Sequence, residues 1–388
     1  MSARFAEAFD LQQARRYAEA ARIYAALAKT HLTVNLAQNL AMCLEATGDY
    51  AGAEHWLAMA AGHRPDDPVV KRLMGSLLAA QGRLDEAEQA FRVALALRPG
   101  DPGATLALAA LLLSVGRFAE GWPLMEARLE VQEGAVPQVA LPYPEWRGEP
   151  LAGRSVLVAV EQALGDQIQM ARFAQTLKAR GAGLVTLACR PPLVSVLETA
   201  PGVDAVVGIA AGEAASVPRH DCWTRYFSLP ARLGITLETL PAAPYLFARP
   251  ERRARWRGFS GVGLAWQASA AGFNGAEKSL SRELADELLD LGCVSLRPED
   301  TSAQDLADTA AVIDQLDLVI SVDTAAAHLA GAMGKPCWTL LPALRTDWRW
   351  MRDRSDSPWY PTMRLFRQRT PGDWRPIVEE VKAALAAR

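Results

Sequence analysis

Segment 323–332 reads Asp323-Thr324-Ala325-Ala326-Ala327-His328-Leu329-Ala330-Gly331-Ala332. It follows the apolar run 316–321, which predicts a buried strand, and its small residues predict a helix that begins at once. The first turn of such a helix offers unbonded N–H groups and the positive end of the helix dipole, which together favour a phosphate. An ordinary strand-to-helix connection has the same pattern, so this segment alone leaves both interpretations open.

Length and composition indicate a packed protein of several domains. The chain has 388 residues, of which 50% are hydrophobic and 22% charged, with a net charge of −3. The length predicts two or three domains, and the charge gives no reason to expect a nucleic-acid partner. The basic cluster at 252–257 is typical of a solvated helix face. Because no window reaches 18 uninterrupted apolar residues and the start has no apolar core, we expect no membrane span and a cytoplasmic location.

The spacing of metal-binding residue types argues against a metal site. The five cysteines are far apart and form no C-x-x-C pair: Cys43, Cys189, Cys222, Cys293 and Cys337. The five histidines are dispersed, and no D-x-D triplet occurs. We therefore expect reduced thiols, no metal and metal-independent chemistry. The nucleophile motif G-x-S-x-G of serine hydrolases is also absent.

The first 130 residues repeat with a period of 34. Small and large residues recur at matching offsets: Gly48, Gly82 and Gly116; Ala53, Ala87 and Gly121; Leu57, Phe91 and Met125. Pro65 and Pro99 close two units, and the 16–28 segment reads as the second half of an earlier one. This pattern resembles the tetratricopeptide repeat, in which each helix pair buries its apolar face against its neighbours. We predict an α-solenoid of about three and a half units over 1–134, with a groove for a protein or peptide.

The rest of the chain alternates short β-rich runs with helical segments. A Pro-rich linker over 135–150 separates it from the repeats. Strands are expected at 155–160, 184–188, 203–209, 261–266, 293–296, 316–321 and 336–341, with helices at 165–180 and 376–387. The pattern pauses around 243–257, which predicts two α/β lobes, 151–250 and 258–388, each with a parallel sheet. Strand ends of the two lobes would then flank a shared cleft.

Carboxylates after the first strand of the first lobe are candidates for acid–base chemistry. Asp166 lies near a helix start at the carboxyl edge of that strand, where it can accept a proton from a hydroxyl within hydrogen-bond distance. Asp is equally a good N-cap, so a capping role for Asp166 stays open. Glu161 is a weaker second candidate.

The second lobe supplies candidate groups for an anionic ligand. Trp266 and Gln267 begin a loop after its first strand, and Lys278 ends it, where a lysine can neutralise a departing phosphate or can simply be solvated. His328 lies one turn after Thr324, where it either holds a phosphate oxygen or packs as a core histidine. The aromatic residues at 347–350 and 359–360 can stack a base or a sugar, or can pack the lobe.

Several segments together resemble a known enzyme group. They are Pro144–Arg154, Leu164-Gly165-Asp166, Asp317–Thr324 with His328–Gly331, Asp347-Trp348-Arg349-Trp350 and Ser357–Gln368. The combination resembles the bacterial TPR-linked glycosyltransferases of the GT-B fold, related to heptosyltransferases of family 9 and more distantly to O-GlcNAc transferases of family 41. The resemblance implies two Rossmann-like lobes and an inverting transfer of a sugar from a nucleotide-activated donor.

The resemblance also implies roles for individual residues. Asp166 matches the proposed base, and Lys278, Asp323, Thr324 and His328 match the contacts to the donor's phosphates. Ala325, Trp266 and Gln267 lie at the same donor site. No cofactor is expected besides the donor itself, whose nucleotide we expect to be CMP or UDP. A protein acceptor in the repeat groove is expected, and flagellin is the acceptor that the resemblance suggests.

Two departures from the family pattern keep other functions open. Ala163 stands where relatives usually carry glycine, and the segment between Leu296 and Asp305 is too short for the expected helix and strand. A shortened donor lobe would fit an adaptor in which the repeats bind a partner and a degenerate GT-B module does not turn over. A transferase acting on lipopolysaccharide or another glycan is the third possibility, although a saccharide acceptor needs no peptide groove.

Overall fold

The computed structural model describes residues 3–131, 141–210, 217–269 and 275–388. Part of the predicted linker, 135–140, and part of the loop after Trp266, 270–274, lie outside these residues. The chain divides into two compact units. The repeat unit comprises Met1–Val115 and Pro123–Ala135, and the α/β unit comprises Gly116–Trp122 and Val136–Arg388. Residues 116–122, predicted to be part of the solenoid domain, thus group with the α/β unit.

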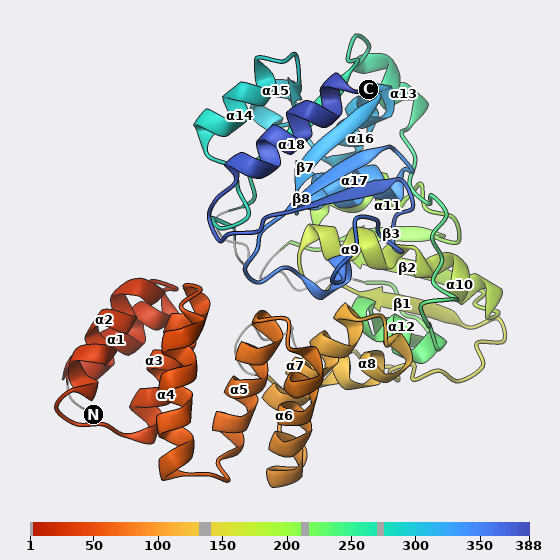
Figure 1. The fold of residues 1–388 in the computed structure, drawn as a ribbon. Helices are drawn as coiled ribbons and strands as arrows, with labels where there is room; N and C mark the ends of the chain where they lie inside the picture. Colours follow the sequence, from red (N-terminus) through yellow and green to blue (C-terminus); the bar gives the residue numbers. More distant parts are fainter. Residues whose placement is uncertain (1–2, 132–140, 211–216, 270–274) are drawn as a thin grey trace. The chain divides into compact units, whose positions relative to one another are not determined.

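Paired helices make up the repeat unit (Figure 1). They are α1 (Ala3–Gln13), α2 (Tyr17–Ala28), α3 (Val34–Ala46), α4 (Tyr50–His63), α5 (Pro68–Ala80), α6 (Leu84–Leu97), α7 (Pro102–Ser114) and the 3₁₀ turn η1 (Glu126–Leu129). The eighth helix, α8 (Phe118–Met125), pairs with α7 in the repeat pattern but begins in the α/β unit. The predicted α-solenoid is confirmed. Helix α1, with Ala8 and Gln12 buried, completes the first pair, so the described residues hold four pairs rather than three and a half.

Turn chemistry fixes the repeat length. Gly48 and Gly82 adopt φ of 83° and 79° between the helices of a pair, a region that favours glycine. Asp67 and Asp101 cap α5 and α7, each followed by a proline in the first turn, where the missing N–H costs nothing. Gly75 leaves room for Phe91, since a Cβ there would lie 2.6 Å from the ring. The glycine turns, the capped helix starts and the contact of a small residue with a large one recur in successive helix pairs. They explain the period of 34 residues in the sequence.

The first lobe of the α/β unit is built on a four-stranded parallel sheet. Its strands are β1 (Ser155–Ala159), β2 (Leu184–Cys189), β3 (Ala205–Gly208) and β4 (Cys222–Arg225), in the order β3-β2-β1-β4. Its helices are α9 (Leu164–Ala171), α10 (Phe173–Ala179), η2 (Pro191–Leu193), α11 (Val194–Leu197), η3 (Tyr226–Ser228) and α12 (Leu229–Leu233).

Two features of this lobe differ from the prediction. The predicted helix 165–180 is interrupted at Arg172, whose Nε bonds the Gln169 carbonyl and whose Nη1 bonds the carbonyls of Pro241 and Trp359. Strand β4 was not predicted, because Trp223 and Arg225 give its four residues no simple apolar run, although all four are buried.

The second lobe is built on a five-stranded parallel sheet. Its strands are β5 (Val262–Ala265), β6 (Val294–Ser295), β7 (Leu318–Val322), β8 (Cys337–Leu341) and β9 (Met363–Arg367), in the order β6-β5-β7-β8-β9. Its helices are α13 (Pro250–Arg255), α14 (Arg282–Leu289), α15 (Pro298–Thr301), α16 (Leu306–Gln315), α17 (Ala325–Ala332), η4 (Trp348–Trp350) and α18 (Arg375–Ala386). The predicted pair of parallel α/β lobes is confirmed.

Packing in the second lobe follows the apolar faces of its helices. Helices α14 and α18 pack on the sheet through side chains such as Leu284 and Val378, which share a core with Leu264 and Ile320 (Figure 1). Strand β6 is only two residues long, and the one-turn helix α15 joins it to α16. Residues 297–305 therefore hold one helical turn and no strand, in keeping with the short connection expected there.

The basic cluster at 252–257 is not simply a solvated face. Arg252 bonds Asp305 and Asp308 at 3.2 and 2.7 Å, and Arg253 bonds Asp314 at 2.9 Å. Helix α13 thus packs on α16 through the ion pairs of Arg252 and Arg253 within the second lobe. Arg255 and Arg257 are exposed, as a solvated face predicts.

Candidate functional site

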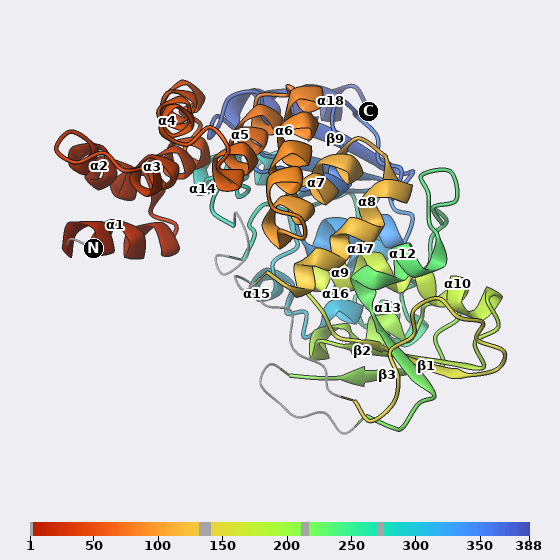
Figure 2. The same ribbon diagram turned by 90° about the horizontal axis from the view of Figure 1, so that it is seen from below.

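Helices α9 and α17 follow the carboxyl ends of β1 and β7 and lie side by side (Figure 2). Gly165 in the first turn of α9 faces His328 of α17 so closely that a Cβ at position 165 would lie 2.6 Å from His328 Cδ2. Glycine is therefore what allows the two helices to touch. The contact brings the start of α9, which carries Asp166, against α17, which carries His328 and begins just after Asp323 and Thr324.

Asp166 carries both a capping bond and an ion pair. Its Oδ2 accepts the Ala163 backbone N–H at 3.0 Å, and its Oδ1 lies 2.5 Å from Arg349 Nη2. The preceding Gln162 has φ of 60°, an uncommon region for a residue with a side chain. Both interpretations of Asp166 are compatible with this geometry, because a carboxylate has further lone pairs to offer a hydroxyl.

Arg349 is a buried residue of the site that the sequence did not single out. It lies in η4, 7% exposed, and its Nε bonds Asp347 Oδ1 at 2.9 Å. Burial opposes its charge, but the carboxylates of Asp347, Asp166 and Asp323 outweigh that effect and raise the Arg349 pKa. Its signals in the sequence were its position between two tryptophans and the resemblance of Asp347-Trp348-Arg349-Trp350 to the glycosyltransferase pattern, and neither gave Arg349 a role.

His328 is buried and neutral. Its Nδ1 lies 2.9 Å from the Tyr360 hydroxyl, its Nε2 lies 3.9 Å from Asp323 Oδ1, and its ring lies 5.2 Å from that of Trp350. Burial, reinforced by Arg349, Arg172 and Lys278, lowers its pKa well below the usual value. His328 thus combines the packed position of a core histidine with a place beside the charged residues of the site.

Lys278 and Asp323 form an ion pair at the start of α17. Lys278 Nζ lies 3.0 Å from Asp323 Oδ2, and the two side chains are 19% and 12% exposed. The turn that carries Lys278 is held to the end of β5, because Leu280 N–H donates to the Trp266 carbonyl at 3.0 Å and Ser279 Oγ accepts from Ala268 N–H. The Lys278 ammonium group is therefore held beside the N-terminus of α17.

The N-terminus of α17 has no side-chain cap. Thr324 occupies the N-cap position with φ −141° and ψ 173°, but its hydroxyl bonds Ser321 Oγ at 3.0 Å instead of capping the helix. The N–H groups of the first turn, which begins at Ala325, are thus left to a partner such as a phosphate oxygen. Thr324 and Ala325 are only half-buried, so a ligand can approach them.

Trp266 and Gln267 lie at the end of β5 in different environments. Trp266 is buried, with the guanidinium groups of Arg282 and Arg297 at 5.8 and 5.3 Å from its ring. Gln267 is exposed. The tryptophan therefore contributes to the core beneath the loop, whereas Gln267 is open to solvent.

Glu161 lies deeper than Asp166. Its carboxylate is 1% exposed and accepts the Phe227 backbone N–H at 3.2 Å.

The aromatic residues of 347–360 pack together, since the ring centre of Trp348 lies 5.2 Å from that of Trp122 and 6.1 Å from that of Trp359. Aromatic packing is thus the use that the structure displays for this segment.

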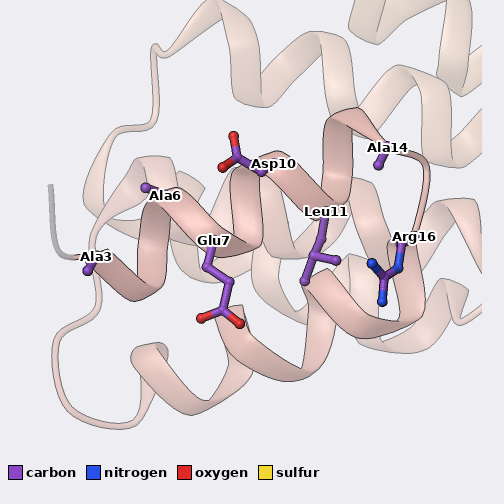
Figure 3. Close-up of a pocket in the computed structure, with 7 residues that line it drawn as sticks. All are labelled: Ala3, Ala6, Glu7, Asp10, Leu11, Ala14 and Arg16. Atoms are coloured by element: carbon purple, nitrogen blue, oxygen red, sulfur yellow. The ribbon is translucent and has the colours of Figure 1, made fainter.

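A shallow pocket on α1 of the repeat unit contains none of the predicted site residues (Figure 3). Its lining consists of Ala3, Ala6, Glu7, Asp10, Leu11, Ala14 and Arg16. Glu7 and Asp10 point in different directions there, and Arg16 is paired with Glu19 at 2.7 Å.

In the described part of the chain, no three His, Cys, Asp or Glu side chains gather as metal ligands would. None of the helices that the structure describes has the length and hydropathy needed to cross a membrane.

Comparison with protein families separates the chain into the same two parts. Residues 11–77 and 78–131 match the tetratricopeptide repeat family. Residues 257–344 match glycosyltransferase family 9 (heptosyltransferase), a range that includes Lys278, Asp323 and His328. The predicted combination of tetratricopeptide repeats with a family 9 glycosyltransferase segment is confirmed.

A curated relative shares sequence across both parts. Protein FlbA of Caulobacter vibrioides is 27% identical over 313 residues, which are 69% of this chain and 52% of the relative. The chain thus spans about half the length of the relative it matches.

Two solved structures each resemble a portion of the chain. A family 9 glycosyltransferase of Veillonella parvula covers 61% of this chain and 91% of its own, with 14% identity and a TM-score of 0.44. The Yersinia enterocolitica chaperone SycD, solved with a peptide of the translocator YopD, covers 28% of this chain and 90% of its own, with 24% identity and a TM-score of 0.26.

Proposed function

Because this chain joins tetratricopeptide repeats to a glycosyltransferase family 9 segment, we propose that it transfers a sugar from a nucleotide-activated donor to a hydroxyl of a protein acceptor. The observation that carries the proposal is the contact between α9 and α17. At this contact Asp166 of one lobe bonds Arg349, which lies 3.4 Å from His328 Nε2 of α17 in the other lobe. The uncapped start of α17 also carries the pair of Lys278 and Asp323. A sugar transfer needs both a proton acceptor and a site for the leaving phosphate.

The donor's phosphate binds at the start of α17 in this proposal. The N–H groups from Ala325 onward and the Lys278 ammonium supply hydrogen bonds and positive charge, while Asp323 holds the lysine in place. Thr324 and the neutral His328 line the same end of the helix. Trp266 and Gln267 lie at the adjacent end of β5, on the side where the rest of the nucleotide would extend.

Asp166 is the proposed base. It takes the proton of the acceptor hydroxyl, the hydroxyl oxygen bonds to the anomeric carbon, and the bond from that carbon to the phosphate oxygen breaks. A single displacement of this kind inverts the anomeric configuration. The nucleotide leaves with both electrons of the broken bond, and Lys278 with the α17 N-terminus stabilises its charge. No step of this scheme requires a metal ion.

The repeats select the acceptor. Helix pairs of this type form extended surfaces suited to peptides and proteins, so the sugar is expected on a Ser or Thr hydroxyl of a protein such as flagellin. The compartment proposed is the cytoplasm, where CMP- or UDP-linked donors are made.

A non-catalytic adaptor remains the second candidate, favoured by one observation. The connection between β6 and α16 holds only the single turn of α15, so the donor lobe is shortened. In an adaptor the repeats would bind a partner and the α/β unit would not bind a donor.

Nucleotide binding separates the two candidates. The full chain is heated with UDP, GDP, ADP or CMP at millimolar concentration, alongside Lys278→Ala, because a ligand that binds only the folded state raises the midpoint. Lys335→Ala is the control, since this lysine bonds the Asp314 carbonyl and not Asp323. A shift with one nucleotide that Lys278→Ala loses and Lys335→Ala keeps supports the transferase. No shift with any nucleotide favours the adaptor.

A further inference from the structure

We propose that Arg349 is a positioning residue that orients the Asp166 carboxylate for proton abstraction. The inference rests on the proposed function and adds a residue to it. Arg349 comes from the second lobe and Asp166 from the first, 183 positions apart in the chain. Through this pair the lobe that holds the donor sets the geometry of the base.

The guanidinium is held on three sides. Nη2 bonds Asp166 Oδ1 at 2.5 Å, Nε bonds Asp347 Oδ1 at 2.9 Å, and Nη1 lies 3.4 Å from His328 Nε2. Asp347 Oδ1 also accepts the backbone N–H of Arg349 at 3.0 Å, so the same carboxylate fixes its main chain and its side chain. A planar fork with this many donors has little freedom to rotate.

The carboxylate that Arg349 contacts is fixed at both oxygens. Ala163 N–H bonds Oδ2 and Arg349 bonds Oδ1, which together define the plane of the Asp166 carboxylate. The Ala163 bond alone would leave the group free to pivot about that oxygen. Arg349 is thus the contact that determines which lone pair faces an acceptor hydroxyl.

The segment around Arg349 is strained and tightly supported. Arg345, Met351 and Asp353 have φ of 52°, 50° and 53°, a region that L residues rarely adopt. Arg367 of β9 fastens the segment, because its Nη2 bonds the Trp350 carbonyl at 2.6 Å and its Nε bonds the Arg354 carbonyl at 2.8 Å. Such strain persists where the surroundings over-determine the conformation, and it concentrates at functional sites.

Aromatic packing supports the same segment from behind. Trp348 meets Trp122 edge to face at 5.2 Å and Phe227 at 6.4 Å. Trp122 belongs to the α/β unit although it lies within the range that matches the repeat family. Through these ring contacts Trp348 packs the turn that carries Arg349 against the rest of the α/β unit.

The test compares Arg349→Ala and Arg349→Lys with Arg354→Ala. Arg354 lies in the same segment and pairs with Asp356 at 2.7 Å, in a similar two-residue arrangement, but it touches none of the proposed site. Turnover is measured as nucleotide release from a panel of CMP-, UDP-, GDP- and ADP-sugars in the presence of flagellin, the acceptor proposed above. The midpoint shift caused by the matching nucleotide is a separate measure of binding. Circular dichroism checks that each variant is folded.

We expect Arg349→Ala to lower kcat about 100-fold, as misplaced catalytic groups do, with KM for the donor within about threefold of wild type. The kcat of Arg349→Lys also stays low, because an ammonium group cannot reproduce the planar set of donors of the guanidinium. Added guanidinium at about 50 mM restores part of the Arg349→Ala rate, an effect that a purely structural role would not give. Arg354→Ala behaves like wild type.

The outcomes separate this inference from the proposed function. If the wild type turns over and Arg349→Ala matches Arg354→Ala, or loses donor binding as fully as turnover, the positioning role is overturned while the transferase stands. If the folded wild type releases nucleotide from none of the donors, the transferase itself fails, and the positioning role with it.

Discussion

A Cβ at position 165 would lie 2.6 Å from His328 Cδ2, so Gly165 is the residue that lets the two lobes of the α/β unit meet at their helix N-termini. His328 cannot yield, because its ring is buried against Trp350 and bonded to Tyr360. The contact therefore links helix packing directly to the geometry of the candidate site.

Gly165→Ala should destabilise the chain by about 1–3 kcal/mol, the usual cost of overpacking. Urea unfolding of the full chain measures the change. Gly62→Ala is the control, since nothing lies within 4 Å of a Cβ at that exposed helical position. Alanine there should raise the free energy of unfolding by about 0.5–1 kcal/mol. Equal effects of the two substitutions would contradict the close contact.

The neutral His328 predicts a loss of stability as pH falls. Its pKa is lowered in the folded chain, so the unfolded chain binds the proton more readily, and stability should decline as pH drops below about 6.5. The slope from this group is at most about 1.4 kcal/mol per pH unit. Urea midpoints between pH 7.5 and 5.5 should fall less for His328→Gln than for wild type. If the urea midpoints of wild type and His328→Gln changed equally with pH, His328 would be protonated as readily in the folded chain as in the unfolded one, which contradicts this prediction.

Two arginines of α13 should differ in their importance. Arg252 pairs with Asp308, whose side chain is 0% exposed, whereas Arg253 is 61% exposed and pairs with Asp314. Arg252→Ala should cost about 1–3 kcal/mol by leaving a buried carboxylate with one partner fewer, although Trp256 and Gln304 still donate to it. Arg253→Ala should change stability by less than about 1 kcal/mol. Similar losses for both variants would refute the distinction.

All five cysteines should resist thiol reagents in the native chain. Each is buried, and burial raises the pKa of Cys189 and Cys337 to about 12 and that of Cys293 to about 11. Because the thiolate is the reactive form, a colourimetric disulfide reagent at pH 8 should label them only after denaturation. Fast reaction of any thiol in the native chain would disagree with the structure.

The sequence predicted the architecture well where local patterns determine it. The period of 34 arises from glycine turns and from small residues facing large ones, as at Gly75 and Phe91. The main strands arise from apolar runs that are buried on both faces. Strand β4 escaped prediction because Trp223 and the terminal Arg225 leave its four residues no such run. Strand β9 escaped because Arg364 breaks its apolar run and Arg367 ends it.

The candidate site could be predicted only in part. Asp166, Lys278 and Asp323 follow strands whose carboxyl ends are recognisable, so their positions were predictable. Their partners were not, because the Arg349 to Asp166 pair joins positions 183 apart and depends on how two lobes pack. A buried arginine between tryptophans has no local pattern that distinguishes it from an exposed one.

Nucleotide release from the donor panel in the presence of flagellin as acceptor, by wild type and by Asp166→Asn, tests the central claim most directly. Wild type should consume one nucleotide sugar, and Asp166→Asn should do so about 10²–10⁴ times more slowly, as expected for loss of a general base, while the nucleotide still raises its midpoint. If the folded wild type consumes none of the donors faster than buffer alone, or if Asp166→Asn keeps the full rate, the transferase mechanism described for this chain is contradicted.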